Sequence, residues 1–436
     1  MTSAPVTPLP TPAGRSPTIP LSIMMFLQFF LWGAWFVTLG PYMDTLKMGG
    51  EKDAGTWIGN AYSTAPIAAI IAPFFLGVVA DRFFASQRVM GVLHLLGGLL
   101  LLAAPTVAKT SVENPLPFVG ILLLHMLCYM PTLGLSNTVA FHTMNNPEKQ
   151  FPLIRVWGTI GWIVAGLLVG FLARYLVPES EGPAARAASP HFFYVAGASG
   201  ILLGLFSFLL PNTPAPMKGK PVDVGAILGR DALGLLRDRP FLIFAIASLL
   251  ICIPLAAYYS MAGTFVGRFY EDVPTTMTFG QMSEIFFMLV MPLFFARLGV
   301  KWMLAVGMLA WVLRYGLFAA AWGDGGANAD LKWLVLGGVI LHGICYDFFF
   351  VTGQIYVEKK ASADIRGQAQ GFLVLITQGV GMLIGNQLIG RLRDHFTSDG
   401  VVDWRSVWLA PAVFALVILV GFVLLFREAD AAERAS

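Results

Sequence analysis

Charged residues are scarce in this chain of 436 residues: Asp, Glu, Lys and Arg make up 12% of it, whereas hydrophobic residues make up 57%. A soluble domain usually carries about 25% charged residues, so the composition predicts an integral membrane protein. The net charge of +3 is too small to indicate a nucleic-acid partner. The sequence also has no phosphate-binding loop, nucleophile elbow or metal-binding His-x-x-x-His pair. We therefore expect no enzyme, no cofactor and no metal site.

Cysteine is rare as well. Cys128, Cys252 and Cys345 are the three in the chain, and each falls in an apolar stretch. Because the number of cysteines is odd and their surroundings are apolar, we expect no structural disulfides. We expect buried, unreactive thiols instead.

Long apolar runs dominate the rest of the sequence. A helix needs about 20 apolar residues to cross the hydrocarbon core of a bilayer. By this criterion the sequence predicts twelve transmembrane helices, and the fold class is an all-α integral membrane protein. The expected spans are 21–43, 57–80, 88–107, 115–140, 153–175, 191–210, 240–264, 277–296, 301–322, 331–356, 367–390 and 405–426. The first run is too long for a signal peptide, so we expect it to stay in the mature protein.

The longest polar interruption follows the sixth span and divides the chain in two. The expected organisation is a tail (1–20), a six-helix half (21–210), a linker (211–239), a second six-helix half (240–426) and a short tail (427–436). The linker region carries five basic residues, the last of them Arg239, and Lys and Arg favour the cytoplasmic side of a membrane protein. Both termini are therefore expected in the cytoplasm.

Two six-helix halves joined by a basic loop resemble the layout of the major facilitator superfamily. The segment 77–82 (GVVADR) resembles the loop signature Gly-x-x-x-Asp-Arg of that superfamily, although the usual Gly-Arg-Arg continuation is missing. We expect Gly77, Asp81 and Arg82 to form a gating loop. The alternative is an ordinary charged turn between two spans.

Two carboxylates lie where a charge is costly. Glu284 and Asp347 each fall inside an apolar run, and a charge at the centre of a membrane helix costs roughly 2.5–3.5 kcal/mol on insertion scales. Such groups normally face a cavity or a partner. A carboxyl group in this setting can load and release a proton, so we expect both residues to act in proton coupling.

Polar and aromatic side chains share helix faces in two spans of the first half. Gln28 and Trp32 are four residues apart, and Arg155, Thr159 and Trp162 lie on one face of the span 153–175. They are candidate substrate-binding residues, with the aromatic rings as stacking surfaces. Helix packing is the alternative for Gln28 and Trp32, and snorkelling to the interface is the alternative for Arg155.

In the second half, polar groups accompany each carboxylate. Gln281 precedes Glu284 by three residues, and His342 and Tyr346 lie on the approach to Asp347. We expect all five side chains at the substrate site. A lone membrane histidine is also commonly a packing residue, which is the alternative for His342.

The span 240–264 is interrupted by a proline. Pro254 breaks the backbone ladder, and Tyr258 and Tyr259 follow it. Broken spans in transporters often bend around the substrate, so both tyrosines are candidate binding residues. Arg314, in the span 301–322, is a candidate counter-ion for either buried carboxylate.

Several of these segments are similar to the nucleoside:proton symporters of the major facilitator superfamily. The similarity runs over most of the chain and is carried by the following segments: 26–35 (FLQFFLWGAW), 129–138 (YMPTLGLSNT), 154–161 (IRVWGTIG), 281–284 (QMSE), 347–349 (DFF), 357–359 (VEK) and 403–404 (DW). The resemblance implies a central pocket that uses Arg155, Thr159, Gln281, Glu284 and Asp347, in which the carboxylates couple proton entry to nucleoside uptake.

The chain also departs from that family. Ala256 and Tyr259 stand where the family has Gln and Asn, Trp162 and Tyr346 stand where it has Phe, and His342 stands where it has Tyr. These positions line the expected substrate wall, so the preference for base or sugar does not carry over.

The function that follows is proton-coupled import of nucleosides by alternating access. We expect a monomer in the bacterial cytoplasmic (inner) membrane whose partners are a nucleoside, the proton and the lipid bilayer. A proton-coupled sugar or oligosaccharide symporter is the main alternative, because it would use similar carboxylates and tryptophans. A drug exporter of the same fold is a weaker alternative.

Overall fold

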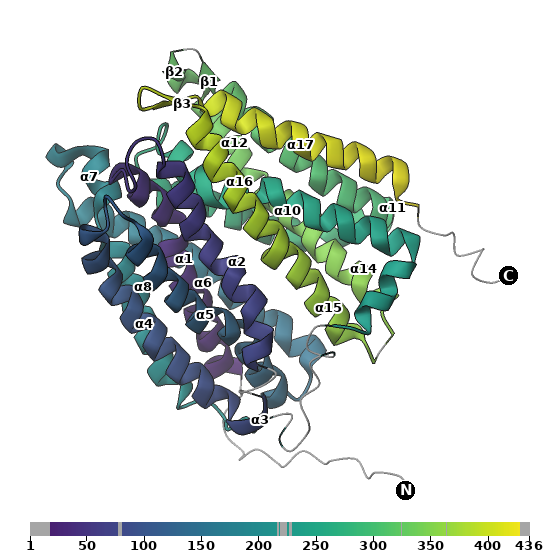
Figure 1. Cartoon of the computed structure of the whole chain (residues 1–436). Coiled ribbons are helices and arrows are strands. Elements are labelled where there is room, and N and C mark those ends of the chain that lie inside the picture. Colours follow the sequence, from purple (N-terminus) through teal and green to yellow (C-terminus); the bar gives the residue numbers. More distant parts are fainter. Residues whose placement is uncertain are drawn as a thin grey trace, which may run out of the picture.

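The computed structural model describes residues 18–76, 81–215, 218, 225, 229–323, 325–362 and 364–427. Long helices fill most of this part of the chain, and Figure 1 shows them in two groups that follow the sequence. Gly77 of the expected gating loop lies outside the described residues.

The first group of helices is formed by the N-terminal half. Its elements are α1 (Thr18–Thr45), α2 (Ala54–Phe75), α3 (Asp81–Phe83), α4 (Ser86–Thr110), α5 (Leu116–Thr143), α6 (Pro147–Leu176), η2 (Glu179–Glu181), α7 (Gly182–Ala188) and α8 (His191–Ser207).

The second group belongs to the C-terminal half. Its helices are η3 (Ala232–Arg237), α10 (Arg239–Val266), α11 (Val273–Ala320), η4 (Ala329–Leu331), α12 (Lys332–Ile340), α13 (His342–Cys345), η5 (Tyr346–Val351), α14 (Thr352–Lys360), α15 (Arg366–Val374), η6 (Leu375–Gly381), α16 (Met382–His395) and α17 (Trp404–Leu425). Two short antiparallel ribbons connect helices: β1 (Trp322–Gly323) pairs with β2 (Gly326–Ala327), and β3 (Thr397–Ser398) pairs with β4 (Val401–Val402).

Ten helices within the described residues are long and apolar enough to span a membrane, and the bent pair Glu179–Ala188 and His191–Ser207 provides an eleventh. One of the ten is α11, whose 48 residues would extend roughly 70 Å, more than twice the thickness of the hydrocarbon core. Its backbone leaves the helical region at Gly299, where φ is 64° and ψ is −178°. A left-handed φ is accessible to glycine without strain. The break makes α11 two spans, in agreement with the twelve expected.

Side-chain caps fix the start of several helices. The Asn146 side chain accepts a hydrogen bond from the Lys149 backbone N–H at the start of α6, and Asp272 does the same for Thr275 at the start of α11. Asp403 accepts from the backbone N–H groups of Arg405 and Ser406 and so begins α17. Each cap satisfies backbone donors that a helix leaves unpaired in its first turn.

Two of the expected spans are not regular α-helices. The span expected at 331–356 consists of α12, α13, η5 and α14, and η5 is π-helical. The span expected at 367–390 consists of α15, the π-helical η6 and α16. Short π-helical turns inside α-helices are frequent at functional sites, and η5 contains Asp347.

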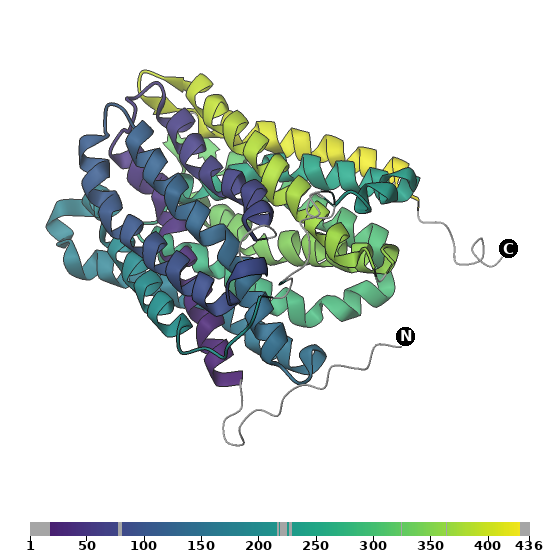
Figure 2. The same cartoon turned by 60° about the horizontal axis from the view of Figure 1, so that its bottom comes forward.

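The two halves meet along their inner helices. The α2 and α16 helices approach so closely that a Cβ at Gly59 would collide with the Asn386 carbonyl oxygen. The α6 helix also packs on α11, since Gly166 faces Thr278. In Figure 1 the helices of the two halves converge near β3 and α7 and diverge toward α3 and α15. Figure 2, turned by 60°, keeps the purple and blue helices on one side and the green and yellow helices on the other.

Candidate functional site

In the C-terminal half, a cluster of polar and aromatic side chains surrounds Glu284. The Glu284 Oε2 atom lies 4.0 Å from Nε2 of His342, and the side chain of Glu284 is 14% exposed. The imidazole of His342 stacks on the ring of Tyr258, with 5.3 Å between centroids and 17° between planes. The rings of Tyr259 and Tyr346 lie 6.3 and 6.0 Å from the same imidazole. Glu284 comes from α11, the tyrosines at 258 and 259 from α10, and His342 from α13.

Asp347 is close to this cluster but more deeply placed. It is 0% exposed, and neither of its carboxylate oxygens has a hydrogen-bond partner within the described residues. It is near enough to Glu284 for the two carboxylates to interact electrostatically. Two buried like charges that act on each other repel, and protonation of either carboxylate relieves the repulsion. The pair is therefore suited to carrying a proton.

The N-terminal half contributes a cation and an aromatic wall opposite the carboxylates. The Arg155 guanidinium lies over the ring of Phe29, with Cζ 4.1 Å from the centroid. Its charge is close enough to act on Glu284 across the interface. The Trp32 and Trp162 rings meet edge to face at 5.4 Å. Arg155 is half-buried, and its guanidinium contacts a ring of α1 in the same half.

The two walls approach each other at Phe36 and Gln281. The Phe36 ring lies 6.4 Å from Trp162 and 6.0 Å from Tyr259, so it bridges the aromatic groups of both halves. Trp162 and Gln281 line one narrow crevice between α1, α6 and α11, which has no room for a water molecule. The Gln281 side chain is 8% exposed, and its Oε1 atom has no partner among the described residues. Thr159 lies half-buried on α6, one turn from Arg155.

Gln28 occupies a different environment from the other candidates. It is 0% exposed, its Nε2 donates to the Thr132 hydroxyl at 2.7 Å, and its Oε1 lies 2.9 Å from Nε2 of His94. The Tyr129 hydroxyl donates to its backbone carbonyl at 2.8 Å. All of these partners belong to the N-terminal half. In this conformation the Gln28 amide joins α1 to α4 and α5, which is the packing alternative of the sequence analysis.

Arg314 does not pair with either carboxylate. Its Nη1 and Nη2 atoms have no hydrogen-bond partner within the described residues, and its Nε donates to the Gly338 carbonyl at 3.0 Å. The guanidinium instead lies over the Tyr258 ring, with Cζ 3.9 Å from the centroid. The expectation of a direct counter-ion was wrong, because the groups that contact the guanidinium are the Tyr258 ring and the Gly338 carbonyl.

The described part of the segment that was expected to form a gating loop is short. Asp81 and Arg82 form part of α3, and the Arg82 side chain is 9% exposed.

No three His, Cys, Asp or Glu side chains come together in a metal-binding group in the part of the chain that the structure describes.

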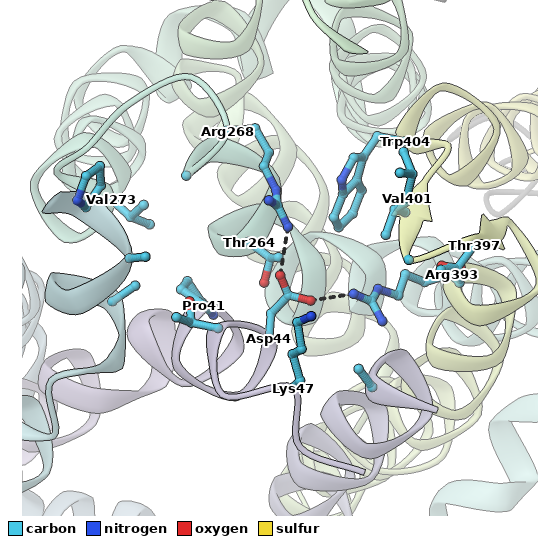
Figure 3. A pocket seen from close by; sticks show the side chains of 18 of the residues that line it. Pro41, Asp44, Lys47, Thr264, Arg268, Val273, Arg393, Thr397, Val401 and Trp404 are labelled. Carbon is cyan, nitrogen blue, oxygen red and sulfur yellow. Dashed lines mark hydrogen bonds and ion pairs between the residues drawn. The ribbon is translucent and has the colours of Figure 1, made fainter. Parts of the chain in front are cut away.

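The end at which the halves converge carries ion pairs that sequence patterns did not indicate. Asp44 of α1 accepts from Arg268 at 2.8 Å and also pairs with Arg393 of α16, and Figure 3 shows its carboxylate between the two guanidinium groups. Arg174 pairs with Asp272 at 2.7 Å. We call the end of the molecule that carries these pairs the ion-paired end. The residues involved are far apart in the sequence, so no spacing could reveal them.

Asp394 reinforces the same end. Its two carboxylate oxygens accept from the backbone N–H groups of Gly55 and Thr56, each at 2.7 Å. These donors are at the start of α2, where backbone N–H groups are otherwise unpaired. A carboxylate of the C-terminal half thus caps a helix of the N-terminal half.

A cavity of about 540 Å³ opens beside Asp44 and is lined by residues of both halves, among them Arg268, Arg393 and Trp404. Its size would suit a small molecule. Neither Glu284 nor Asp347 lines it. It is therefore a vestibule at the ion-paired end, separate from the carboxylate cluster.

Comparison with known proteins places this arrangement in a family. The family model described as nucleoside H+ symporter matches residues 16–431. The chain belongs to the nucleoside H+ symporter family. It is 40% identical over 420 residues to the putative nucleoside transporter YegT of Escherichia coli, a match that covers 95% of this chain and 94% of the relative. It is 33% identical over 423 residues to the nucleoside permease NupG of Escherichia coli, covering 93% and 95%.

Solved structures agree with this assignment. The crystal structure of the nucleoside transporter NupG superposes with a TM-score of 0.81 at 32% identity, covering 95% of this chain and 100% of that one. The family and the major facilitator fold expected from the sequence are therefore confirmed. The chain is a multi-span membrane protein of a transporter family.

Proposed function

We propose that this nucleoside H+ symporter family member imports nucleosides together with protons across the bacterial cytoplasmic membrane. The observation that carries the proposal is the position of Glu284: it lies at the interface of the two halves, beside His342 and within reach of the charge of Arg155. A carboxyl group that is shared between two moving halves can link its protonation to their relative position.

The residues divide the work between binding and coupling. The aromatic rings of Trp32, Trp162 and Tyr259 offer flat faces for a nucleobase, while Arg155 and Gln281 offer donors and an acceptor for polar substituents. The remaining candidates are Thr159, Tyr258, His342 and Tyr346, which border the same region, and Gln28, which would enter the site only if its present hydrogen bonds were exchanged.

A transport cycle follows from the two carboxyl groups. A proton on Glu284 or Asp347 removes a buried negative charge, and this removal permits the halves to close around the substrate. The loaded carrier changes its open side, and the proton and the nucleoside leave. The change of state needs differential stability of two arrangements and no chemistry on the substrate.

Sidedness and organisation belong to the same proposal. The Lys and Arg distribution supports cytoplasmic termini, which makes the ion-paired end extracytoplasmic and the divergent end cytoplasmic. The structure then corresponds to an inward-facing carrier. The halves 21–210 and 240–426 would move about the linker 211–239, with Gly77, Asp81 and Arg82 as part of the cytoplasmic gate. The carrier would work as a monomer.

Uptake into proteoliposomes tests the proposal. Labelled uridine and adenosine are supplied with and without an imposed inward proton gradient, and unlabelled nucleosides or sugars are added as competitors. Accumulation that requires the gradient and is blocked by nucleosides alone is the expected result. Gradient-driven uptake of a sugar would contradict the assignment of nucleosides as the substrate. Equal uptake of nucleoside without a gradient would contradict coupling to the proton. Arg366→Gln is the control variant, because it removes a 3.1 Å pair with Glu358 that is about half exposed and joins two residues of the C-terminal half.

A further inference from the structure

Arg314 is a buried cation without a counter-ion. Its side chain is 0% exposed in the middle of the second segment of α11, and two of its three nitrogens have no hydrogen-bond partner among the described residues. Removing a guanidinium from water is costly unless other groups compensate. The side chain makes two close contacts, with the Tyr258 ring and with the Gly338 carbonyl. Both contacts lead to His342.

The first contact runs through aromatic rings. The Arg314 guanidinium lies 3.9 Å above the Tyr258 ring, which is a cation–π contact in a dry environment. Tyr258 stacks in turn on the His342 imidazole, with planes only 17° apart. Nε2 of that imidazole lies 4.0 Å from Oε2 of Glu284. Arg314, Tyr258, His342 and Glu284 therefore form a continuous row, which we call the Arg314–Glu284 row.

The second contact runs through the backbone. Nε of Arg314 donates to the carbonyl of Gly338, one turn before His342 on the same span. Guanidinium geometry fixes the direction of this bond while the plane of the group stays over the tyrosine. One side chain thus holds both the backbone that carries the imidazole and the ring on which the imidazole rests.

The span that carries His342 is also fastened directly to the helix of Glu284. The Ser283 hydroxyl donates to the Ile340 carbonyl at 2.6 Å and accepts from the Gly343 N–H at 2.9 Å. A Cβ at Gly343 would lie 2.6 Å from the Ser283 carbonyl oxygen, so the two backbones pack without room for a side chain at Gly343. This contact fixes where His342 lies along Glu284, and the Arg314–Glu284 row fixes how its ring is turned.

We propose that Arg314 is a positioning residue for proton coupling: through Tyr258 it orients His342, and His342 orients the carboxyl group of Glu284. The inference rests on the proposed function, because it assigns a role within that proton-coupled cycle. The positioning role of Arg314 extends the proposed function by adding a residue that contacts neither the substrate nor the proton.

Other groups face the row and contribute to its electrostatics. From α10 and η5 the tyrosines surround the imidazole, from α11 Gln281 lies beside Glu284, and from α6 the Arg155 charge reaches Glu284. These titratable, charged or polar neighbours are Tyr258, Tyr259, Tyr315, Cys345, Tyr346, Gln281, Arg155 and Asp347. Among the hydrogen bonds of the described residues, Arg314 is the side chain that donates to the Gly338 carbonyl.

The test uses the full-length chain in proteoliposomes and two readouts for labelled uridine. One is exchange of uridine at equal pH on both sides, recorded across a pH series. The other is accumulation under an inward proton gradient. Two variants change Arg314: Arg314→Met removes the charge and Arg314→Lys keeps a charge. Two others change Tyr258: Tyr258→Leu removes the aromatic ring and Tyr258→Phe keeps it.

In Arg314→Met and Tyr258→Leu we expect the pH midpoint of exchange to move by about one pH unit, with gradient-driven accumulation reduced about tenfold. Arg314→Lys and Tyr258→Phe should recover most of the parent midpoint. The double variant of Arg314→Met and Tyr258→Leu should move the midpoint no further than either single variant, because the two residues act in one row. Tyr315→Phe is the matched structural control: it removes a buried 2.6 Å bond to the Pro254 carbonyl next to Arg314 and should keep the midpoint.

The outcomes separate the two proposals. If the unaltered protein shows no proton-dependent transport of either uridine or adenosine, the proposed function fails. If it does, but Arg314→Met keeps the parent midpoint and accumulation ratio, the positioning role is wrong. If Arg314→Met does not fold, Tyr258→Leu decides in the same way. If the pH midpoint moves equally in Tyr315→Phe, the shift reflects a general destabilisation of the C-terminal half. That result would also overturn the inference.

Discussion

Replacing Asp44 with Asn should shift the balance between the two open states of the carrier. Asp44 places its carboxylate between Arg268 and Arg393 at the ion-paired end (Figure 3), and the side chain of Arg393 is only 6% exposed. Breaking a buried pair by removing one partner costs about 3–5 kcal/mol. Arg393 keeps a second contact, with Asp394 at 3.3 Å, so part of that penalty is offset.

The remaining penalty sets the size of the effect. The half-exposed Arg268 loses little, because exposed pairs contribute about 0–1 kcal/mol. Loss of the Asp44 partner of Arg393 should destabilise the state in which the ion-paired end is closed by about 2 kcal/mol. This energy corresponds to a roughly 30-fold shift of the equilibrium toward opening at this end. Arg393 regains water when the end opens, so the penalty applies to the closed state alone.

Cysteine labelling measures the shift. In a background in which Cys128, Cys252 and Cys345 are replaced, Thr264→Cys reports on the ion-paired end, because Thr264 is 4% exposed and borders the cavity beside Asp44. A membrane-impermeant maleimide should label this cysteine at least about tenfold faster with Asp44→Asn than without it.

The control for this labelling experiment is Glu51→Gln. It removes the pair of Lys47 with Glu51, which lies at the same end but within one half, and it should leave the rate unchanged. Equal labelling rates with and without Asp44→Asn would refute the idea that this cluster holds the end closed.

Three further predictions concern the carboxylate site and the contact between the halves. Asp347→Asn should abolish gradient-driven accumulation of uridine while leaving exchange measurable, and unchanged accumulation would remove Asp347 from the coupling. Trp162→Ala should raise the dissociation constant for nucleoside by about tenfold, measured by equilibrium binding, with a smaller effect on turnover; equal affinity would assign the ring to packing. Gly59→Leu should speed labelling of Thr264→Cys, because any Cβ there would collide with the Asn386 carbonyl oxygen; unaltered labelling would show that α2 and α16 tolerate separation.

The sequence allowed prediction of the spans because long apolar runs and their polar separators follow directly from the thickness of a bilayer. Even the break in α11 was visible, as the short turn around Gly299 between the expected spans 277–296 and 301–322. The π-helical segments were not visible. The backbone of one of them packs against a residue that is distant in sequence, Gly307, where a Cβ would lie 3.0 Å from the backbone nitrogen of Phe349.

Prediction of the site from the sequence had the same limit. The cost of burying a charge singled out Glu284 and Asp347 without any knowledge of their partners. The pairing of Glu284 with His342 joins positions in different spans, so no periodicity could indicate it. The side chain of Arg314 looked like a counter-ion because it is a cation in an apolar run, whereas packing placed an aromatic ring beside it.

The most direct test of proton coupling records the lumenal pH of proteoliposomes that hold a pH-sensitive dye. Uridine is added outside with no imposed proton gradient and with the membrane potential clamped by valinomycin and potassium. We predict that inward movement of uridine acidifies the lumen in the unaltered protein and does not do so in Glu284→Gln. Uridine entry without any acidification in the unaltered protein would contradict the account, because the nucleoside would then cross without a proton.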